Sequence, residues 1–121
     1  MEDFNKLIIY LMAIEGKAKD IHYNCSGADF YGKHLFADRI AEGISDFIDQ
    51  IKETCILGKG EKPLFAYEYF KQASGLIRNQ TDFRALYELI IDCLDLIESF
   101  KYVSRGDSKL LDDIANKLQN D

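Results

Sequence analysis

Histidines and carboxylates recur at helical spacing within residues 22–53. His34 and Asp38 are four residues apart, and so are Asp49 and Glu53. Residues four apart lie on one face of an α-helix. Asp49 follows Asp38 by eleven residues, which is close to three whole turns, so a continuous helix would place both pairs on one stripe. Imidazole and carboxylate donors together suit a metal such as iron or zinc.

This stripe is too long for one metal ion to use within a single chain. At ~1.5 Å per residue, Asp38 and Asp49 would lie roughly 16 Å apart along the helix axis. That separation is far outside a coordination sphere. A second copy of the helix, antiparallel across a two-fold axis, would bring the His34 end of one chain against the Glu53 end of the other. The spacing therefore predicts an intersubunit metal site.

A longer motif surrounds these pairs. Residues 22–30 read HYNCSGADF and precede the two pairs in the chain. The whole stretch resembles the ferroxidase signature of the Dps-type miniferritins, a His-aromatic-Asn-x-x-Gly-x-x-Phe run followed by a second His, an Asp, a further Asp and a Glu. The resemblance is detailed over residues 22–53 and extends more weakly to the remaining helices. The matching ligand positions are His22, His34, Asp38, Asp49 and Glu53.

The resemblance implies an activity and a role for each of these residues. Asp49 and Glu53 of one subunit, with His22 of the other, would hold the tighter-bound iron. His34 and Asp38 would bind a second iron or a bridging water. The chain would be a ferroxidase that oxidises Fe(II) with hydrogen peroxide in preference to dioxygen, for iron detoxification, iron storage and protection against oxidative stress. It would form two-fold dimers that build a hollow shell of twelve subunits.

Two positions depart from the family pattern. Tyr23 stands where the family commonly has Trp, and either ring could quench radicals, shield the site or pack against a neighbour. Leu35 stands where many relatives carry an acid that lines the storage cavity, which predicts poor mineral nucleation without loss of oxidation. The alternative function is therefore a non-catalytic ferritin-fold assembly protein with a vestigial metal site.

Length and charge limit the other functions. The chain has 121 residues, enough for one domain with a single core, and we expect one domain over residues 1–121. One proline and 47% hydrophobic residues indicate a compact, mainly helical protein. Sequence-independent binding to DNA needs clustered Lys and Arg, so the formal charge of −6 predicts no direct DNA binding.

The cysteines and the apolar runs indicate the compartment. Cys25, Cys55 and Cys93 form no Cys-x-x-Cys pair, and an odd count in a helical protein indicates reduced intracellular thiols. Each is more often a small buried residue than a ligand. The apolar run 7–14 is too short to span a bilayer. We therefore expect a cytoplasmic protein without a membrane partner.

The apolar periodicity predicts an all-α fold, a ferritin-like four-helix bundle with a short helix in the long crossover and a shortened fourth helix. Thr81 or Asp82 is expected to cap the third long helix, and Gly106 to end it. Gly43 is expected inside the second helix, for close approach of another backbone. The expected helices cover about 3–22, 30–57, 63–72 and 83–103, and the last begins at 108 and runs for roughly three turns.

Other side chains keep two explanations. The aromatic residues of the crossover point in more than one direction on a helix, so some are expected to pack against a partner subunit. Asp107, Asp112 and Asp113 near the last helix are candidates for an acidic pore, and a capped, solvated helix end explains them equally well. The crossover aromatics are Phe65, Tyr67, Tyr69 and Phe70.

Overall fold

The computed structural model describes residues 2–24, 30–78, 82–100 and 104–120. Within these ranges all regular structure is helical, so the all-α prediction is confirmed for the described chain. No helix in the described ranges is both long enough and apolar enough to cross a membrane. The elements are α1 (Glu2–Asn24), α2 (Phe30–Ala41), α3 (Ile44–Gln50), a π-helix η1 (Ile51–Ile56), a 3₁₀-helix η2 (Leu57–Lys59), α4 (Ala66–Ile77), α5 (Phe83–Glu98) and α6 (Arg105–Asn120).

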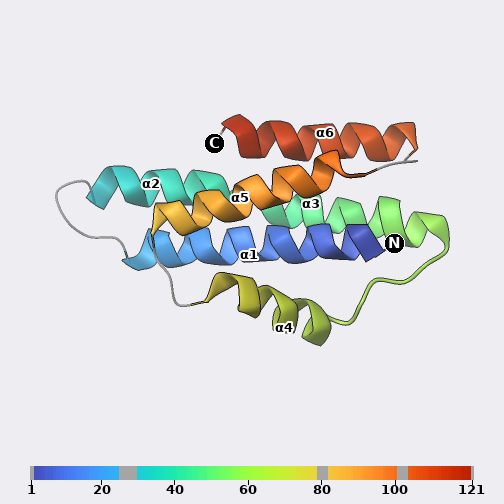
Figure 1. Ribbon diagram of the computed structural model, residues 1–121, viewed down its shortest axis with the longest axis horizontal. Coiled ribbons are helices and arrows are strands. Elements are labelled where there is room, and N and C mark those ends of the chain that lie inside the picture. Colours follow the sequence, from blue (N-terminus) through green and yellow to red (C-terminus); the bar gives the residue numbers. More distant parts are fainter. Residues whose placement is uncertain (1, 25–29, 79–81, 101–103, 121) are drawn as a thin grey trace.

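Helix α1 is the centre of the bundle, because α2, α3, α4 and α5 all pack against it. In Figure 1, α2 and α3 return along α1 in the opposite direction, and α4 lies on the other side of α1. Helix α6 lies at the edge of the molecule opposite α4 and contacts α5 and η1 (Figure 1). The arrangement is a helical bundle with α4 added outside it.

The core consists of the apolar stripes that the helical periodicity predicts. Each helix turns one apolar face inward, which removes that face from water. Burying a Leu or Ile side chain completely contributes about 1.5–3 kcal/mol. Fully buried positions include Leu7, Ile8, Leu11 and Ile14 of α1, Ile40 of α2, Ile44 of α3, Ile51 of η1, Leu86 and Cys93 of α5, and Ile114 of α6.

The single helix predicted over residues 30–57 is wrong, because the structure interrupts it twice. Helix α2 ends at Ala41, and Gly43 has φ +81°, a left-handed conformation that glycine adopts without a Cβ clash. After α3 the backbone widens into the π-helix η1. A Cβ built on Gly43 would come no closer than 4.0 Å to Lys117 Cε, so Gly43 is needed for its backbone conformation and not for close packing.

The crossover and the last two helices also differ from the prediction. The crossover helix is Ala66–Ile77, so it begins three residues after Pro63. Asp82 does cap α5, since its Oδ1 accepts a hydrogen bond of 2.7 Å from Ala85 N. Thr81 lies outside the described residues. Gly106 does not end a helix but lies in the first turn of α6, which is 16 residues long and therefore exceeds the predicted three turns.

Candidate metal centre

His22 and His34 lie face to face in the structure. His22 is in the last turn of α1, and His34 is in α2, which packs along α1. Their ring centroids are 3.7 Å apart and the ring planes differ by 20°. Two of the five predicted ligand positions are therefore brought together within one chain, although twelve residues separate them in sequence.

Two reciprocal hydrogen bonds fix this pair. His22 Nδ1 donates to the backbone carbonyl of His34, and His34 Nδ1 donates to the carbonyl of His22, each at 2.8 Å. A carbonyl oxygen can only accept, so each Nδ1 must carry a proton. In the neutral ring the lone pair is then on Nε2, the tautomer in which Nε2 can bind a metal.

The helix end explains why these bonds form. The last four carbonyls of a helix have no intrahelical partner, and His22 is in the last turn of α1. The His34 ring satisfies the His22 carbonyl, and α1 and α2 are thereby joined next to the pair. The same contact thus stabilises the helix end and sets the orientation of both imidazoles.

The three predicted carboxylates all face outward. Asp38 lies on α2 one turn after His34, while Asp49 is in the last turn of α3 and Glu53 belongs to η1, and all three side chains are exposed. Asp38 and Asp49 are on opposite sides of the break at Gly43. A common stripe through both pairs needs a continuous helix, so the break at Gly43 makes the predicted common stripe wrong.

Within the described ranges, no three His, Cys, Asp or Glu side chains lie close enough together to hold a metal ion. One chain offers an imidazole pair, a carboxylate one turn after His34 on α2, and two carboxylates on α3 and η1. A site that uses all five predicted residues therefore requires a second chain.

Two neighbours of the histidines are exposed. The Tyr23 ring meets the His22 ring edge-on, with centroids 4.8 Å apart, and 73% of the Tyr23 side chain remains accessible. Leu35, next to His34, is also exposed. Both departures from the family pattern thus lie on the surface of the chain, beside the histidine pair.

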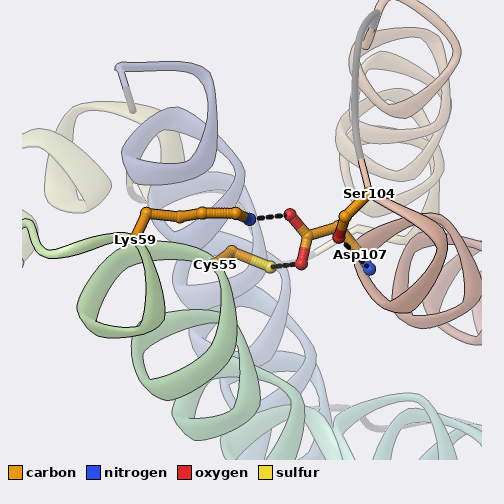
Figure 2. Close-up of polar contacts among 4 residues, drawn as sticks. All are labelled: Cys55, Lys59, Ser104 and Asp107. Carbon is orange, nitrogen blue, oxygen red and sulfur yellow. Dashed lines mark hydrogen bonds and ion pairs between the residues drawn. The ribbon is translucent and has the colours of Figure 1, made fainter.

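A second polar cluster was not predicted as a unit. Asp107, in the first turn of α6, is only 2% exposed and forms an ion pair with Lys59 of η2 (Figure 2). Cys55 Sγ of η1 donates to Asp107 Oδ1 over 3.4 Å, and Ser104 Oγ accepts from Asp107 N over 3.2 Å.

The suggestion that Asp107 lines an acidic pore is wrong for this chain, because the Asp107 side chain is buried in this cluster. The Ser-x-x-Asp spacing predicts the helix cap, whereas nothing in the local sequence indicates partners 48 and 52 residues away.

The described cysteines do not act as thiolates near neutral pH. Burial, aided by the Asp107 carboxylate, raises the pKa of Cys55 to about 12. Burial alone raises the pKa of Cys93 to about 12. Metals bind the thiolate and not the thiol, so neither residue is a good ligand. Cys25 lies outside the described residues.

The crossover aromatics point in different directions, as predicted. Tyr69 is buried, and its hydroxyl donates to Asn5 Oδ1 and accepts from Leu64 N. Phe65, Tyr67 and Phe70 face solvent, with Phe65 86% exposed. We call these three exposed side chains the aromatic patch.

Comparison with known proteins gives no independent identification: no protein-family model matches the chain, and no curated protein matches it significantly.

Proposed function

We propose that this chain is a Dps-type ferroxidase that oxidises Fe(II) with hydrogen peroxide, or with dioxygen, for iron detoxification and storage. The substrate iron would bind across a two-fold interface between two chains, within a dodecamer built from these dimers. The proposal rests on the five-residue motif of His22, His34, Asp38, Asp49 and Glu53.

The observation that carries the proposal is the reciprocal bonding of His22 and His34. Ligating histidines characteristically donate their second ring nitrogen to a carbonyl or carboxylate, which fixes the tautomer. Here both rings do so with each other's backbone. Both Nε2 atoms thus carry the lone pair that a metal ligand needs, and the exposed carboxylate of Asp38 lies on the next turn of α2 after His34.

Each proposed ligand has a chemical role in the reaction. Asp49 and Glu53, with His22 of the partner subunit, hold one iron, and His34 and Asp38 hold the second. Anionic oxygen ligands favour the harder Fe(III) product. Two Fe(II) ions each give one electron to a peroxide molecule, which takes up two protons and leaves as two waters. Two iron positions in one site therefore match the two-electron chemistry of peroxide.

The second candidate is a non-catalytic assembly protein, with which the aromatic patch is equally compatible. Phe65, Tyr67 and Phe70 form an exposed apolar group that suits a subunit contact, with or without catalysis. Both functions require a homo-oligomer. Only the ferroxidase requires turnover, so turnover distinguishes them.

The test is Fe(II) oxidation under anaerobic conditions after addition of hydrogen peroxide. We expect two Fe(II) oxidised for each peroxide, and we expect Glu53→Gln or His34→Ala to slow the reaction by at least about tenfold. Glu53 is exposed, so its loss costs little stability, and circular dichroism checks that the variants are folded. Glu61→Gln, an exposed glutamate outside the motif, is the matched control. Equal rates in the wild type and Glu53→Gln would support the assembly protein instead.

A further inference from the structure

The cluster of Cys55, Lys59, Ser104 and Asp107, which we call the latch, joins two elements that are far apart in sequence. It connects the first turn of α6 to the end of the η1–η2 segment (Figure 2). The Asp107 side chain is 3% exposed, while that of Lys59 is 46% exposed. The carboxylate is thus held in the protein interior by a cation that itself reaches solvent.

The latch attaches to the same backbone segment that carries Glu53. Cys55 follows Glu53 by two residues within η1. Leu57 N donates to the carbonyls of Lys52 and Glu53, and Gly60 N donates to Leu57 O. Backbone hydrogen bonds therefore run from Gly60, the residue after Lys59, through Leu57 to Glu53, so we expect a displacement at the latch to move the segment that holds the carboxylate.

We propose that docking of α6 through the latch sets the conformation of the Glu53 segment and thereby regulates metal affinity at this site, an inference that rests on the proposed function. Lys59 and Asp107 are positioning residues, because they act on the metal only through η1. Coupling between two binding events is reciprocal, so a metal bound at Glu53 also favours the docked position of α6.

We expect the latch to have an open position as well as the docked one, for reasons of charge. An ion pair offsets the desolvation cost of a buried carboxylate. Without its cation, the carboxylate has a lower free energy in water than in the protein interior. Asp107 can reach water only if the first turn of α6 moves away from η1. The rest of α6 is held independently by Leu110, Leu111, Ile114 and Leu118, so the opening is local to the N-terminal turn.

The main test uses Lys59→Met in the full, assembled protein, with Co(II) as a probe that is not turned over and calorimetry as the readout. Electrostatics alone predicts tighter Co(II) binding when a positive charge is removed. The latch predicts the opposite, a dissociation constant raised roughly tenfold, as for loss of a residue that orients a ligand. Lys59→Arg keeps the cation and should therefore bind Co(II) with the wild-type affinity. Leu118→Ala, which loosens the far end of α6, should leave affinity unchanged.

Alkylation of Cys55 by iodoacetamide, with sites assigned by peptide mass spectrometry, provides a second readout. Cys55 and Cys93 are both buried, but only Cys55 contacts Asp107, so Lys59→Met should accelerate labelling of Cys55 and not of Cys93. Co(II) should slow labelling of Cys55 in the wild type.

Each outcome decides the inference. The latch is overturned if Lys59→Met leaves the Co(II) affinity or the rate of Cys55 labelling unchanged. It is also overturned if Lys59→Arg does not bind Co(II) with the wild-type affinity. A wild type that binds no Co(II) overturns the proposed function, and the inference with it.

Discussion

The His22 and His34 rings keep each other in place through backbone carbonyls, and this is the most informative residue-level feature of the chain. A solvated imidazole exchanges freely between two tautomers. Here the carbonyl acceptors select the tautomer with the lone pair on Nε2. The two backbone carbonyls therefore hold both histidines in the same tautomer.

At the scale of the residue, sequence spacing predicts which side chains are candidates but not how they meet. The motif selects both histidines, yet their stacking depends on how α1 packs against α2. The latch is a stronger example. Asp107 belongs to an acidic group near α6, and only the fold brings Lys59 and Cys55 to it.

The two thiols give a pH-dependent prediction. Their folded pKa values of about 12 exceed the ordinary value of 9.0, so the folded chain retains protons that the unfolded chain releases. Their contribution to stability is complete below about pH 9 and is lost as the pH rises towards 12. We expect the unfolding free energy of the wild type to fall more steeply over this range than that of Cys55→Ala/Cys93→Ala.

Urea denaturation at pH 7, 8 and 11 measures this effect. The difference between wild type and variant should be constant from pH 7 to 8 and should shrink by about 1 kcal/mol or more by pH 11. A difference that does not change with pH would show that neither thiol is held protonated by the fold.

At the scale of the element, the number and order of the main helices follow from apolar periodicity, while the breaks depend on backbone conformation. A period of 3.6 residues continues through Gly43 in the sequence, because Ile40, Ala41 and Ile44 are all apolar and buried. Because the apolar pattern continues across Gly43, it predicts which residues are buried but gives no sign of the turn between α2 and α3. Gly106 gives the opposite error. The sequence predicts that this glycine ends a helix, whereas it lies in the first turn of α6.

The break at Gly43 can be tested with a second glycine as control. Gly43→Ala puts a Cβ on a residue with φ +81°, which costs about 1–2 kcal/mol. Gly75→Ala lies inside α4, where a new Cβ meets nothing within 4 Å, so it should stabilise by about 0.5–1 kcal/mol. Thermal denaturation should give shifts of opposite sign. A stabilised Gly43→Ala variant would mean that α2 and α3 form one continuous helix in solution.

At the scale of the whole molecule, the separation of the two ligand groups predicts a site shared between chains. Chains with His22→Ala and His34→Ala keep the carboxylates, and chains with Asp49→Asn and Glu53→Gln keep the histidines. Each preparation alone should be inactive. In a mixed dimer one site has both halves intact and the other has neither.

Co-refolding the two preparations measures this complementation. If chains pair at random, half of the dimers are mixed, and the mixture should regain about a quarter of the wild-type oxidation rate. Each preparation refolded by itself is the control. No recovery on mixing would contradict a shared site.

The last prediction concerns DNA, which the charge of the whole molecule should repel. The chain carries 15 Lys and Arg against 21 Asp and Glu, and an assembly multiplies the net charge of −6 by the number of subunits. Binding through phosphates requires local cations that outweigh this repulsion within a Debye length of ~8 Å. We expect no gel shift with duplex DNA at ~0.15 M salt, and any protection of DNA should act through removal of iron and peroxide. A salt-sensitive complex in the absence of divalent ions would contradict this and would direct attention to Lys59, Lys62, Lys71 and Arg78 in the crossover. Lys59→Met would then weaken DNA binding as well as open the latch, and Lys62→Met would weaken DNA binding alone.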